Sequence, residues 1–355
     1  MIAMQVIRTT SSRLTEEVRE RSAFGSVFSD HILVADYTDG AWGEPRILPY
    51  QPLPLPPAPA AVHYGQAAFE GLRAHRTVDG GVALFRVEEN ARRMNRSMAR
   101  LSMPDVPREL FVEGIRALVA LGREWVPRGE GGALYIRPVC FATEECLQVR
   151  AARSYRFVVV TAPVGTYFSG AIRLLVEERY VRACVGGTGE VKPAGNYAGT
   201  LVASMEAQER GYHNVLWLDA REQRFVEEGG VMNLVFVIDD ALVTPPLTGT
   251  ILPGVTRDTL LTLAREAGVR VKERPIAIDE FVRLYREGRV REAAGVGTAA
   301  TIAPVSAIGY KGEDLLLPLT EDSLLMKMRD TIHDIRTGRV PDSHGWLMHV
   351  EEVPA

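Results

Sequence analysis

The sequence predicts a two-domain protein in which β-strands and α-helices form packed layers, an α+β or α/β fold. Its 355 residues exceed what one hydrophobic core usually organises. In both halves of the chain, the spacing of apolar residues switches repeatedly between the period of a strand and that of a helix. A stretch with Gly and Pro at residues 163–170 separates the halves. We therefore expect a small N-terminal α/β domain at 1–163, an interdomain loop at 164–174 and a large C-terminal domain at 175–355.

The first half begins with a β-rich segment at residues 32–37, and the Asp39-Gly40 pair that follows indicates a hairpin. Residues 52–60 hold too many prolines for a helix or a central strand, so we expect an ordered crossing of the surface. A second hairpin is expected around residues 79–81. The remaining apolar patterns predict two helices and then two buried strands, at 87–103, 108–125, 133–141 and 155–164.

The second half alternates in the same way. A helix is predicted from Asn196 to Gly211, where the glycine closes it. Another helix is predicted at residues 256–267, with Thr256 as its N-cap. Strands are expected at 213–219, 231–239 and 241–246.

Composition excludes several classes of protein. The net charge of -4 comes from 41 basic and 45 acidic residues that are interspersed, so no basic run predicts a nucleic-acid partner. No uncharged apolar stretch is long enough for a membrane span, and the N-terminus lacks the pattern of a secretory signal. The histidines show no metal-binding spacing, and the three cysteines are odd in number and lack CxxC spacing. We expect a cytoplasmic protein without a metal or a membrane partner.

The segment VGGTGEVKPAGNYAGT, residues 185–200, surrounds Lys192 with glycines just before a predicted helix. A lysine among apolar neighbours can lose its proton and act as an amine nucleophile. Taken alone, such a loop is more often a solvated turn. A phosphate-binding Walker loop is excluded because Pro193 stands where Ser or Thr would be required. The other three lysines, Lys272, Lys311 and Lys327, fall in outward-facing or turn contexts.

Seven segments, in order, resemble motifs of the branched-chain aminotransferases, which are pyridoxal-phosphate (PLP) enzymes of fold type IV. The resemblance implies a cofactor at the interface of the two domains, and reversible transfer of the amino group of leucine, isoleucine or valine to 2-oxoglutarate. It also implies a homodimer or a higher homo-oligomer. The segments are HYGQAAFEGLRAHR (63–76), FRVEENARRMNRSMARLSMP (85–104), ALYIRP (133–138), KPAGNYAG (192–199), VEEGGVMN (226–233), ILPGVTR (251–257) and GVGTAATIAPV (295–305).

The resemblance assigns cofactor roles residue by residue. Lys192 would form the Schiff base and move the proton of the substrate α-carbon. Glu228 would keep the pyridine nitrogen protonated, and Glu227 would point the other way because side chains alternate along a strand. The remaining implied contacts are Tyr197 to the phenolic oxygen, and Arg93, the amides of Val255 and Thr256, and Thr298 around the phosphate.

Arg92 and Arg96 lie close to Arg93 and could be confused with it in the alignment. For the substrate, the resemblance points to a largely aromatic set, with Tyr64 and Val149 supplied by a second subunit and the Ala299 and Ala300 amides holding the α-carboxylate. From the residues alone, the aromatic members are equally compatible with an ordinary core. The set is Tyr64, Phe69, Tyr135, Arg137, Val149, Tyr167, Ala299 and Ala300.

Arg137 is a lone arginine in the apolar strand ALYIRPVCF, where a charge is costly unless it meets a partner or a ligand. It fits recognition of the distal carboxylate of glutamate, and a hydrogen bond to a buried tyrosine or an ion pair is the alternative. Two departures from the family stand out. Val231 replaces a small or hydroxyl-bearing residue near the substrate carboxylate, and Ala300 and Ala303 replace the two cysteines of the redox switch in mammalian members.

Three other functions stay open at this point. A lyase of the same fold, of the aminodeoxychorismate type, would release pyruvate without a keto-acid acceptor. A D-amino acid aminotransferase would share the motifs but not the substrate. A non-catalytic module that binds PLP or a nucleotide would show no change of absorbance with amino acids.

Overall fold

The computed structural model describes residues 2–21, 25–129, 131–165, 170–317, 320 and 322–351. The chain divides into two compact units by the density of its internal contacts. Unit 1 comprises Met1–Tyr167, Lys192–Ala194 and His333–Ala355, and unit 2 comprises Phe168–Val191 and Gly195–Ile332. In the described part of the chain, no helix is long and apolar enough to cross a bilayer.

The units differ from the predicted domains in two places. Lys192–Ala194 groups with unit 1 because its backbone is hydrogen-bonded to strand β5 (Ala67–Phe69). The C-terminal part of the chain also returns to unit 1, where strand β19 (Leu347–His349) pairs with β7 (Val82–Phe85). Both contacts join residues far apart in sequence, so local apolar patterns could not predict them.

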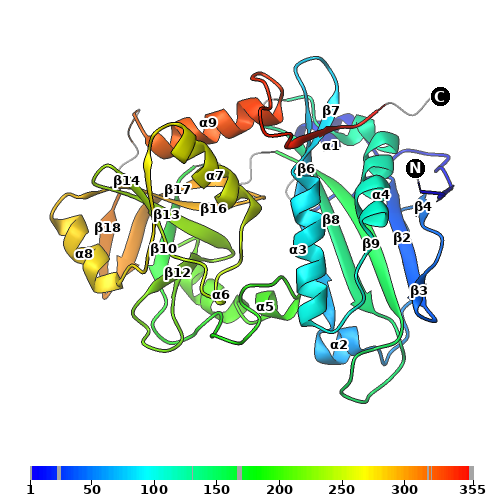
Figure 1. Cartoon of the computed structure of the whole chain (residues 1–355), viewed down its shortest axis with the longest axis horizontal. Coiled ribbons are helices and arrows are strands. Elements are labelled where there is room, and N and C mark those ends of the chain that lie inside the picture. Colours follow the sequence, from blue (N-terminus) through cyan, green and yellow to red (C-terminus); the bar gives the residue numbers. More distant parts are fainter. Residues whose placement is uncertain are drawn as a thin grey trace. The chain divides into compact units, whose positions relative to one another are not determined.

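The sheet of unit 1 follows the order β1-β4-β2-β9-β8-β6-β7-β19, with β3 beside β2 and β5 beside β8. Its pairs are antiparallel except β1 with β4. The strands not yet given bounds are β1 (Gln5–Val6), β2 (His31–Thr38), β3 (Ala41–Trp42), β4 (Arg46–Pro49), β6 (Leu72–Arg76), β8 (Ala133–Ala142) and β9 (Tyr155–Val164). The predicted hairpins and both long buried strands are present (Figure 1).

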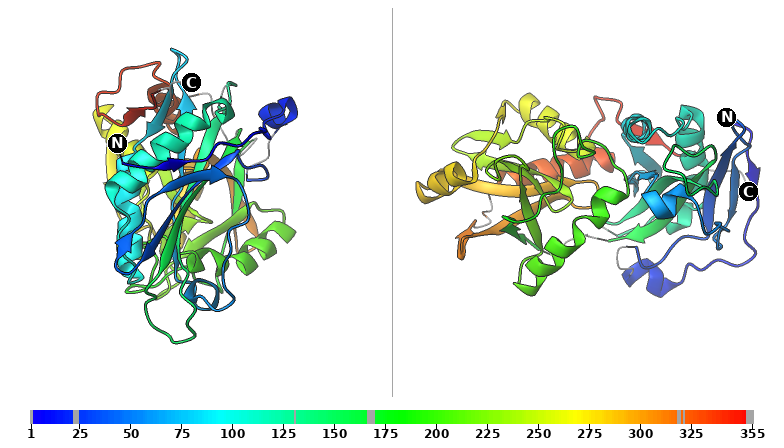
Figure 2. Two further views of the ribbon diagram at one scale, coloured as in Figure 1. Left: turned by 90° about the vertical axis from the view of Figure 1, so that its right-hand side faces the viewer. Right: turned by 90° about the horizontal axis from the view of Figure 1, so that it is seen from below.

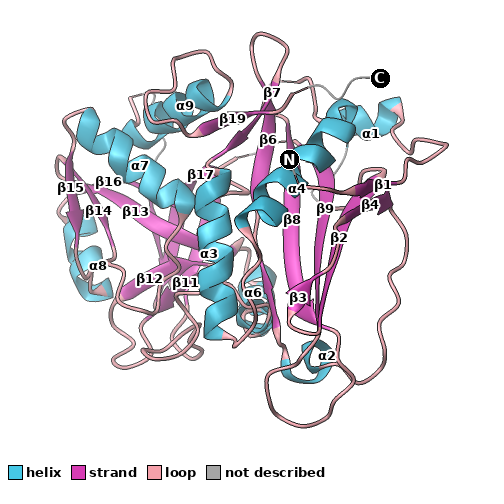
Figure 3. Cartoon of the chain, turned by 45° about the vertical axis from the view of Figure 1, so that its right-hand side comes forward, coloured by secondary structure: helices cyan, strands magenta, loops and turns pink. Residues whose placement is uncertain are grey.

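Helices α3 (Val87–Arg100) and α4 (Arg108–Leu121) lie against one face of this sheet, as Figure 3 shows. The predicted helix at 108–125 ends at Leu121 because Gly122 follows, and a short 3₁₀ turn, η1 (Arg123–Trp125), completes it. The buried face of α3 contains three polar residues, Asn90, Arg93 and Ser97, at helical spacing. Polar groups that a helix buries need partners, so this face is more than core packing.

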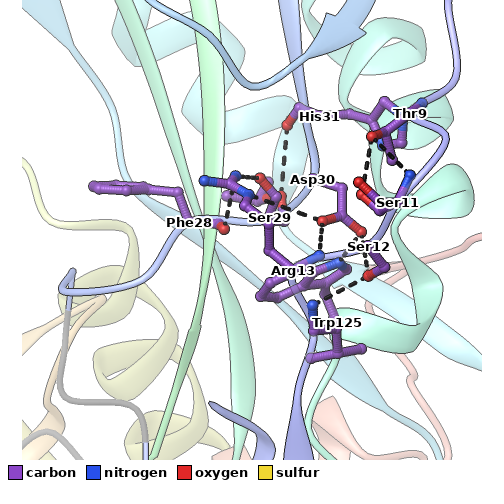
Figure 4. Close-up of polar contacts among 11 residues, drawn as sticks. Thr9, Ser11, Ser12, Arg13, Phe28, Ser29, Asp30, His31 and Trp125 are labelled. Atoms are coloured by element: carbon purple, nitrogen blue, oxygen red, sulfur yellow. Dashed lines mark hydrogen bonds and ion pairs between the residues drawn. The ribbon is translucent and has the colours of Figure 1, made fainter.

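The N-terminal segment is fastened to unit 1 through Asp30 (Figure 4). One carboxylate oxygen accepts the Ser12 hydroxyl at 2.6 Å and the Trp125 indole N–H at 2.9 Å, and the other accepts the Arg13 backbone N–H at 2.7 Å. Helix α1 (Glu16–Arg21) follows and projects from the rest of unit 1, in blue in Figure 2. A second short helix, α2 (Ala60–Tyr64), follows the proline-rich crossing.

The sheet of unit 2 follows the order β12-β11-β10-β17-β16-β13-β14-β15, with β18 beside β17. Strand β12 also pairs with β13, which closes six strands into a ring and sets Glu228 opposite Asn233. The strands are β10 (Ile172–Val176), β11 (Asn214–Leu218), β12 (Val226–Gly229), β13 (Met232–Ile238), β14 (Ala241–Thr244), β15 (Arg270–Glu273), β16 (Val290–Gly297), β17 (Thr301–Tyr310) and β18 (Glu313–Leu316).

The helices of unit 2 correct two predictions. The helix predicted from Asn196 to Gly211 is broken into α5 (Gly195–Ala198) and α6 (Leu201–Glu209), and Gly211 follows with a φ of 81°. Helix α7 (Val255–Glu266) has Gly254, not Thr256, as its N-cap. The other helices are α8 (Ile278–Arg286) and α9 (Leu324–Arg336), which runs from unit 2 into the part of the chain assigned to unit 1.

Candidate active site

Lys192 is held as part of unit 1 by backbone hydrogen bonds. The Phe69 N–H donates to the Lys192 carbonyl at 3.1 Å, and the Ala194 N–H donates to the Ala67 carbonyl at 2.9 Å. Pro193 and Ala68 form an antiparallel bridge between these bonds. The lysine is therefore fixed to a sheet rather than carried by a solvated turn.

The Lys192 amine lies 4.8 Å from the centre of the Phe69 ring. Burial, together with the positive charge of Arg93, lowers the pKa of the amine from 10.5 to about 8, although the Glu70 carboxylate opposes this shift. A substantial fraction of the amines is consequently neutral near pH 8, and a neutral amine is the nucleophilic form.

Arg93 is locked by Glu70, a residue that the sequence analysis did not single out. The guanidinium Nε and Nη2 donate to the two Glu70 oxygens at 2.7 and 2.8 Å, and the Asn90 amide donates to the same carboxylate at 2.9 Å. Burial alone would raise the pKa of Glu70, but the Arg93 charge and these hydrogen bonds bring it below its usual value. A glutamate inside an apolar strand, as in AAFEGL, was the available signal.

Arg137 and Tyr135 lie on the same face of β8 as a hydrogen-bonded pair. The Arg137 Nη2 donates to the Tyr135 hydroxyl at 2.7 Å, and the guanidinium carbon lies 4.6 Å from the centre of the Phe69 ring. Gly71 is required beside them, because a Cβ at that position would lie 2.3 Å from the Tyr135 hydroxyl. The predicted residues Phe69, Tyr135, Arg137 and Lys192 thus lie together in unit 1.

Tyr64 and Val149 lie on an exposed part of unit 1. The Tyr64 hydroxyl donates to the Leu147 carbonyl, which ties α2 to the segment that carries Val149. Val149 itself is 85% exposed. Tyr167 lies outside the described residues.

In unit 2, the Glu228 carboxylate is buried and surrounded by donors. The Arg182 Nε lies 3.1 Å from one oxygen, and the other oxygen accepts the Asn233 amide at 3.0 Å and the Leu252 backbone N–H at 2.9 Å. Glu227, on the other face of β12, is also buried, although alternation had placed it away from the site. Burial raises the pKa of Glu227, whose Oε2 has no hydrogen-bond partner among the described residues.

The same network leads to the N-terminus of α7. Asn233 also donates to the Leu252 carbonyl at 2.9 Å, and a Cβ on Gly254 would lie 2.0 Å from its oxygen. Only glycine therefore fits where the helix begins, which explains why the cap is Gly254 and Thr256 is buried in the first turn. The backbone amides at such a helix start favour anions.

The remaining predicted residues lie on two short segments of unit 2. Tyr197 is on α5, and its carbonyl accepts the Thr200 hydroxyl at 2.8 Å. Thr298, Ala299 and Ala300 form the turn between β16 and β17. Thr301 closes that turn with a φ of 59°, a left-handed conformation that is costly for a β-branched residue.

Comparisons with known proteins agree with one another. Residues 67–308 match the model of the amino-transferase class IV family. The chain is 43% identical over 349 residues to branched-chain-amino-acid aminotransferase 2 of Bacillus subtilis, covering 97% of this chain and 96% of that protein. The chain therefore belongs to the class IV aminotransferases. Within them it belongs with the branched-chain aminotransferases of fold type IV, which confirms the family and the fold class expected from the sequence.

Two solved structures are similar over most of their length. The branched-chain amino acid aminotransferase of Thermobaculum terrenum, in its PLP form, has a TM-score of 0.75 at 25% identity and covers 90% of this chain and 98% of that one. The enzyme from T.th., complexed with N-(5'-phosphopyridoxyl)-L-glutamate, has a TM-score of 0.71 at 29% identity and covers 89% and 98%.

Proposed function

We propose that this protein is a PLP-dependent aminotransferase that moves the amino group of leucine, isoleucine or valine to 2-oxoglutarate, giving the branched 2-oxo acid and glutamate. The observation that carries the proposal is the Lys192 amine, held by a sheet and with its pKa lowered to about 8. The names of the relatives support the substrates, and the PLP-form relative supports the cofactor.

The residues of each unit fit PLP. In unit 1, Lys192 offers the amine that binds the cofactor aldehyde, and Arg93 offers a guanidinium to its phosphate. When bound, PLP supplies an electron-poor ring that takes up the electron pair released at the substrate α-carbon. In unit 2, the start of α7 offers the amides of Val255 and Thr256 to the phosphate, and Glu228 offers a buried carboxylate to the ring nitrogen. We assign Tyr197 to the phenolic oxygen and Thr298 to the phosphate.

Lys192 would also move the proton. Once the substrate amine has replaced it on the cofactor, the neutral Lys192 Nζ can accept the α-proton and return it to the cofactor carbon. A pKa near 8 suits this task, because the amine must both accept and release a proton close to neutral pH.

The substrate residues would serve two kinds of side chain. Phe69 and Tyr135 offer aromatic surface to a branched aliphatic chain. Arg137 offers its charge to the distal carboxylate of glutamate, and its buried Nε has no hydrogen-bond partner among the described residues. The relative from T.th., which is bound to a glutamate adduct, supports this pairing. Ala299 and Ala300 are assigned to the α-carboxylate.

We further propose a homodimer or higher homo-oligomer in the cytoplasm. The exposed Tyr64 and Val149 would complete the substrate site of a second subunit, together with Tyr167. Apolar side chains on α6, namely Leu201, Val202 and Met205, are also exposed and would suit burial by another copy. The three cysteines form no disulfide, as expected in a reducing compartment.

The test is to mix the purified protein with single amino acids and follow the absorbance of the bound cofactor. Leucine, isoleucine and valine should convert it to the pyridoxamine form, and 2-oxoglutarate should restore it. Borohydride reduction should attach the cofactor to the peptide that contains Lys192. Attachment at Lys272, Lys311 or Lys327 would overturn the assignment, and pyruvate release without an acceptor would indicate a lyase.

A further inference from the structure

Ser97 connects the helix that carries Arg93 to the backbone of Lys192. It lies on α3 with a relative exposure of 0%. Its hydroxyl donates to the Arg93 carbonyl at 3.0 Å, and it accepts the backbone N–H of Lys192 at 3.0 Å. Because the single hydroxyl proton is used toward Arg93, a lone pair is directed to Lys192.

The Lys192 N–H has no place in the pairing with β5. That pairing uses the carbonyl of Lys192 and the N–H of Ala194, while Pro193 between them has no N–H. The Lys192 N–H therefore needs an acceptor elsewhere, and Ser97 provides it. An N–H left without a partner in protein costs about 1–3 kcal/mol, so removal of the hydroxyl should let this backbone shift.

These contacts close a ring of five residues. Phe69 binds the Lys192 carbonyl, Lys192 binds Ser97, Ser97 binds the Arg93 carbonyl, and the Arg93 side chain binds Glu70, the residue next to Phe69. Arg93 and Ser97 are four residues apart, so they lie on one face of α3. The helix thereby sets the distance between the guanidinium and the point from which the Lys192 side chain departs.

We propose that Ser97 is a positioning residue for the reaction: its hydroxyl fixes the backbone of Lys192, and thereby the place from which the amine reaches the cofactor and the substrate α-carbon. This inference rests on the proposed role of Lys192. Ser97 itself would touch neither cofactor nor substrate.

The experiment compares Ser97→Ala with Ser29→Ala, which removes another buried serine hydroxyl of unit 1, one that contacts Thr161. Single-turnover reaction with leucine should be about tenfold to a hundredfold slower in Ser97→Ala, because misplacement of about 1 Å has effects of that size. The primary isotope effect with α-deuterated leucine should rise, since proton transfer becomes more limiting. Affinity for pyridoxamine phosphate, which forms no bond to Lys192, should be unchanged in both variants.

A second readout does not depend on turnover. In the enzyme loaded with pyridoxamine phosphate, competitive acetylation against pH should report the pKa of Lys192, with the other three lysines as internal references. Ser97→Ala should raise that pKa from about 8 toward 10.5, as the amine leaves its buried position, and Ser29→Ala should not. Equal rates, isotope effects and pKa values in the two variants would overturn the proposal.

Two further outcomes are separable. If Ser97→Ala does not fold, Ser97→Cys replaces it, because a thiol is similar in size but a weak acceptor. The same changes at smaller amplitude are then expected, and wild-type behaviour would overturn the proposal. If borohydride fails to label Lys192 in the wild-type protein, the proposed function fails whatever Ser97 does.

Discussion

Replacement of Arg137 by Met tests whether one pocket recognises both apolar and acidic side chains. Methionine keeps much of the apolar length of arginine and removes the charge. In the structure the guanidinium is oriented by the Tyr135 hydroxyl at 2.7 Å and by the Phe69 ring at 4.6 Å, which leaves its Nε without a partner among the described residues. Arg137 is therefore oriented but not neutralised by these contacts.

The magnitude follows from the type of bond that is lost. A hydrogen bond between a guanidinium and a carboxylate contributes about 1.5–3 kcal/mol, and about 1.4 kcal/mol corresponds to a factor of ten. The specificity constant for glutamate should therefore fall about tenfold to a hundredfold in Arg137→Met. Leucine has no distal charge, so its half-reaction should lose much less.

Both half-reactions should be measured by single-turnover spectroscopy, with Tyr135→Phe as the matched variant. That substitution removes the hydroxyl that orients Arg137 but keeps the charge and the ring, so its loss with glutamate should be smaller. Equal losses for leucine and glutamate in Arg137→Met would assign Arg137 to structure. The hydrogen bond to Tyr135 would then be its whole role.

Two further predictions concern buried carboxylates. Glu70→Gln should destabilise the fold by about 3 kcal/mol in denaturant unfolding, because it leaves the Arg93 charge buried without its partner, whereas Glu89→Gln on the exposed face of α3 should cost less than about 0.5 kcal/mol. Since the pKa of Glu70 is lowered, the wild-type protein should lose this stability as the pH falls below 4.5, and a Glu70→Gln curve with the same acid limb would refute the assignment. For Glu227 the pKa is raised, so wild-type stability should decrease as the pH rises above 4.5, and Glu227→Gln should remove that decrease. Glu227→Gln should leave the half-reaction nearly unchanged while Glu228→Gln slows it, and equal slowing would mean that the wrong face of β12 was chosen.

Local patterns were sufficient for much of the fold. Alternation and helical spacing located the long strands β8 and β9 and the helices α3 and α7, because these signals depend on neighbours within one or two turns. Element ends were less predictable. Gly122 ended one predicted helix early, and the start of α7 was set by Asn233, a residue from a different strand.

The sequence by itself determined the family and singled out Lys192, since the glycine-rich lysine segment and six other motifs are contiguous and ordered along the chain. Tertiary structure alone decided what holds that lysine. Glu70 and Ser97 reach their partners 23 and 95 residues away in the chain. A hydrogen bond over such a separation depends on how α3 packs against the sheet, and no local pattern of residues encodes that packing. The same reason explains why Lys192–Ala194 belongs to unit 1 although the flanking residues belong to unit 2.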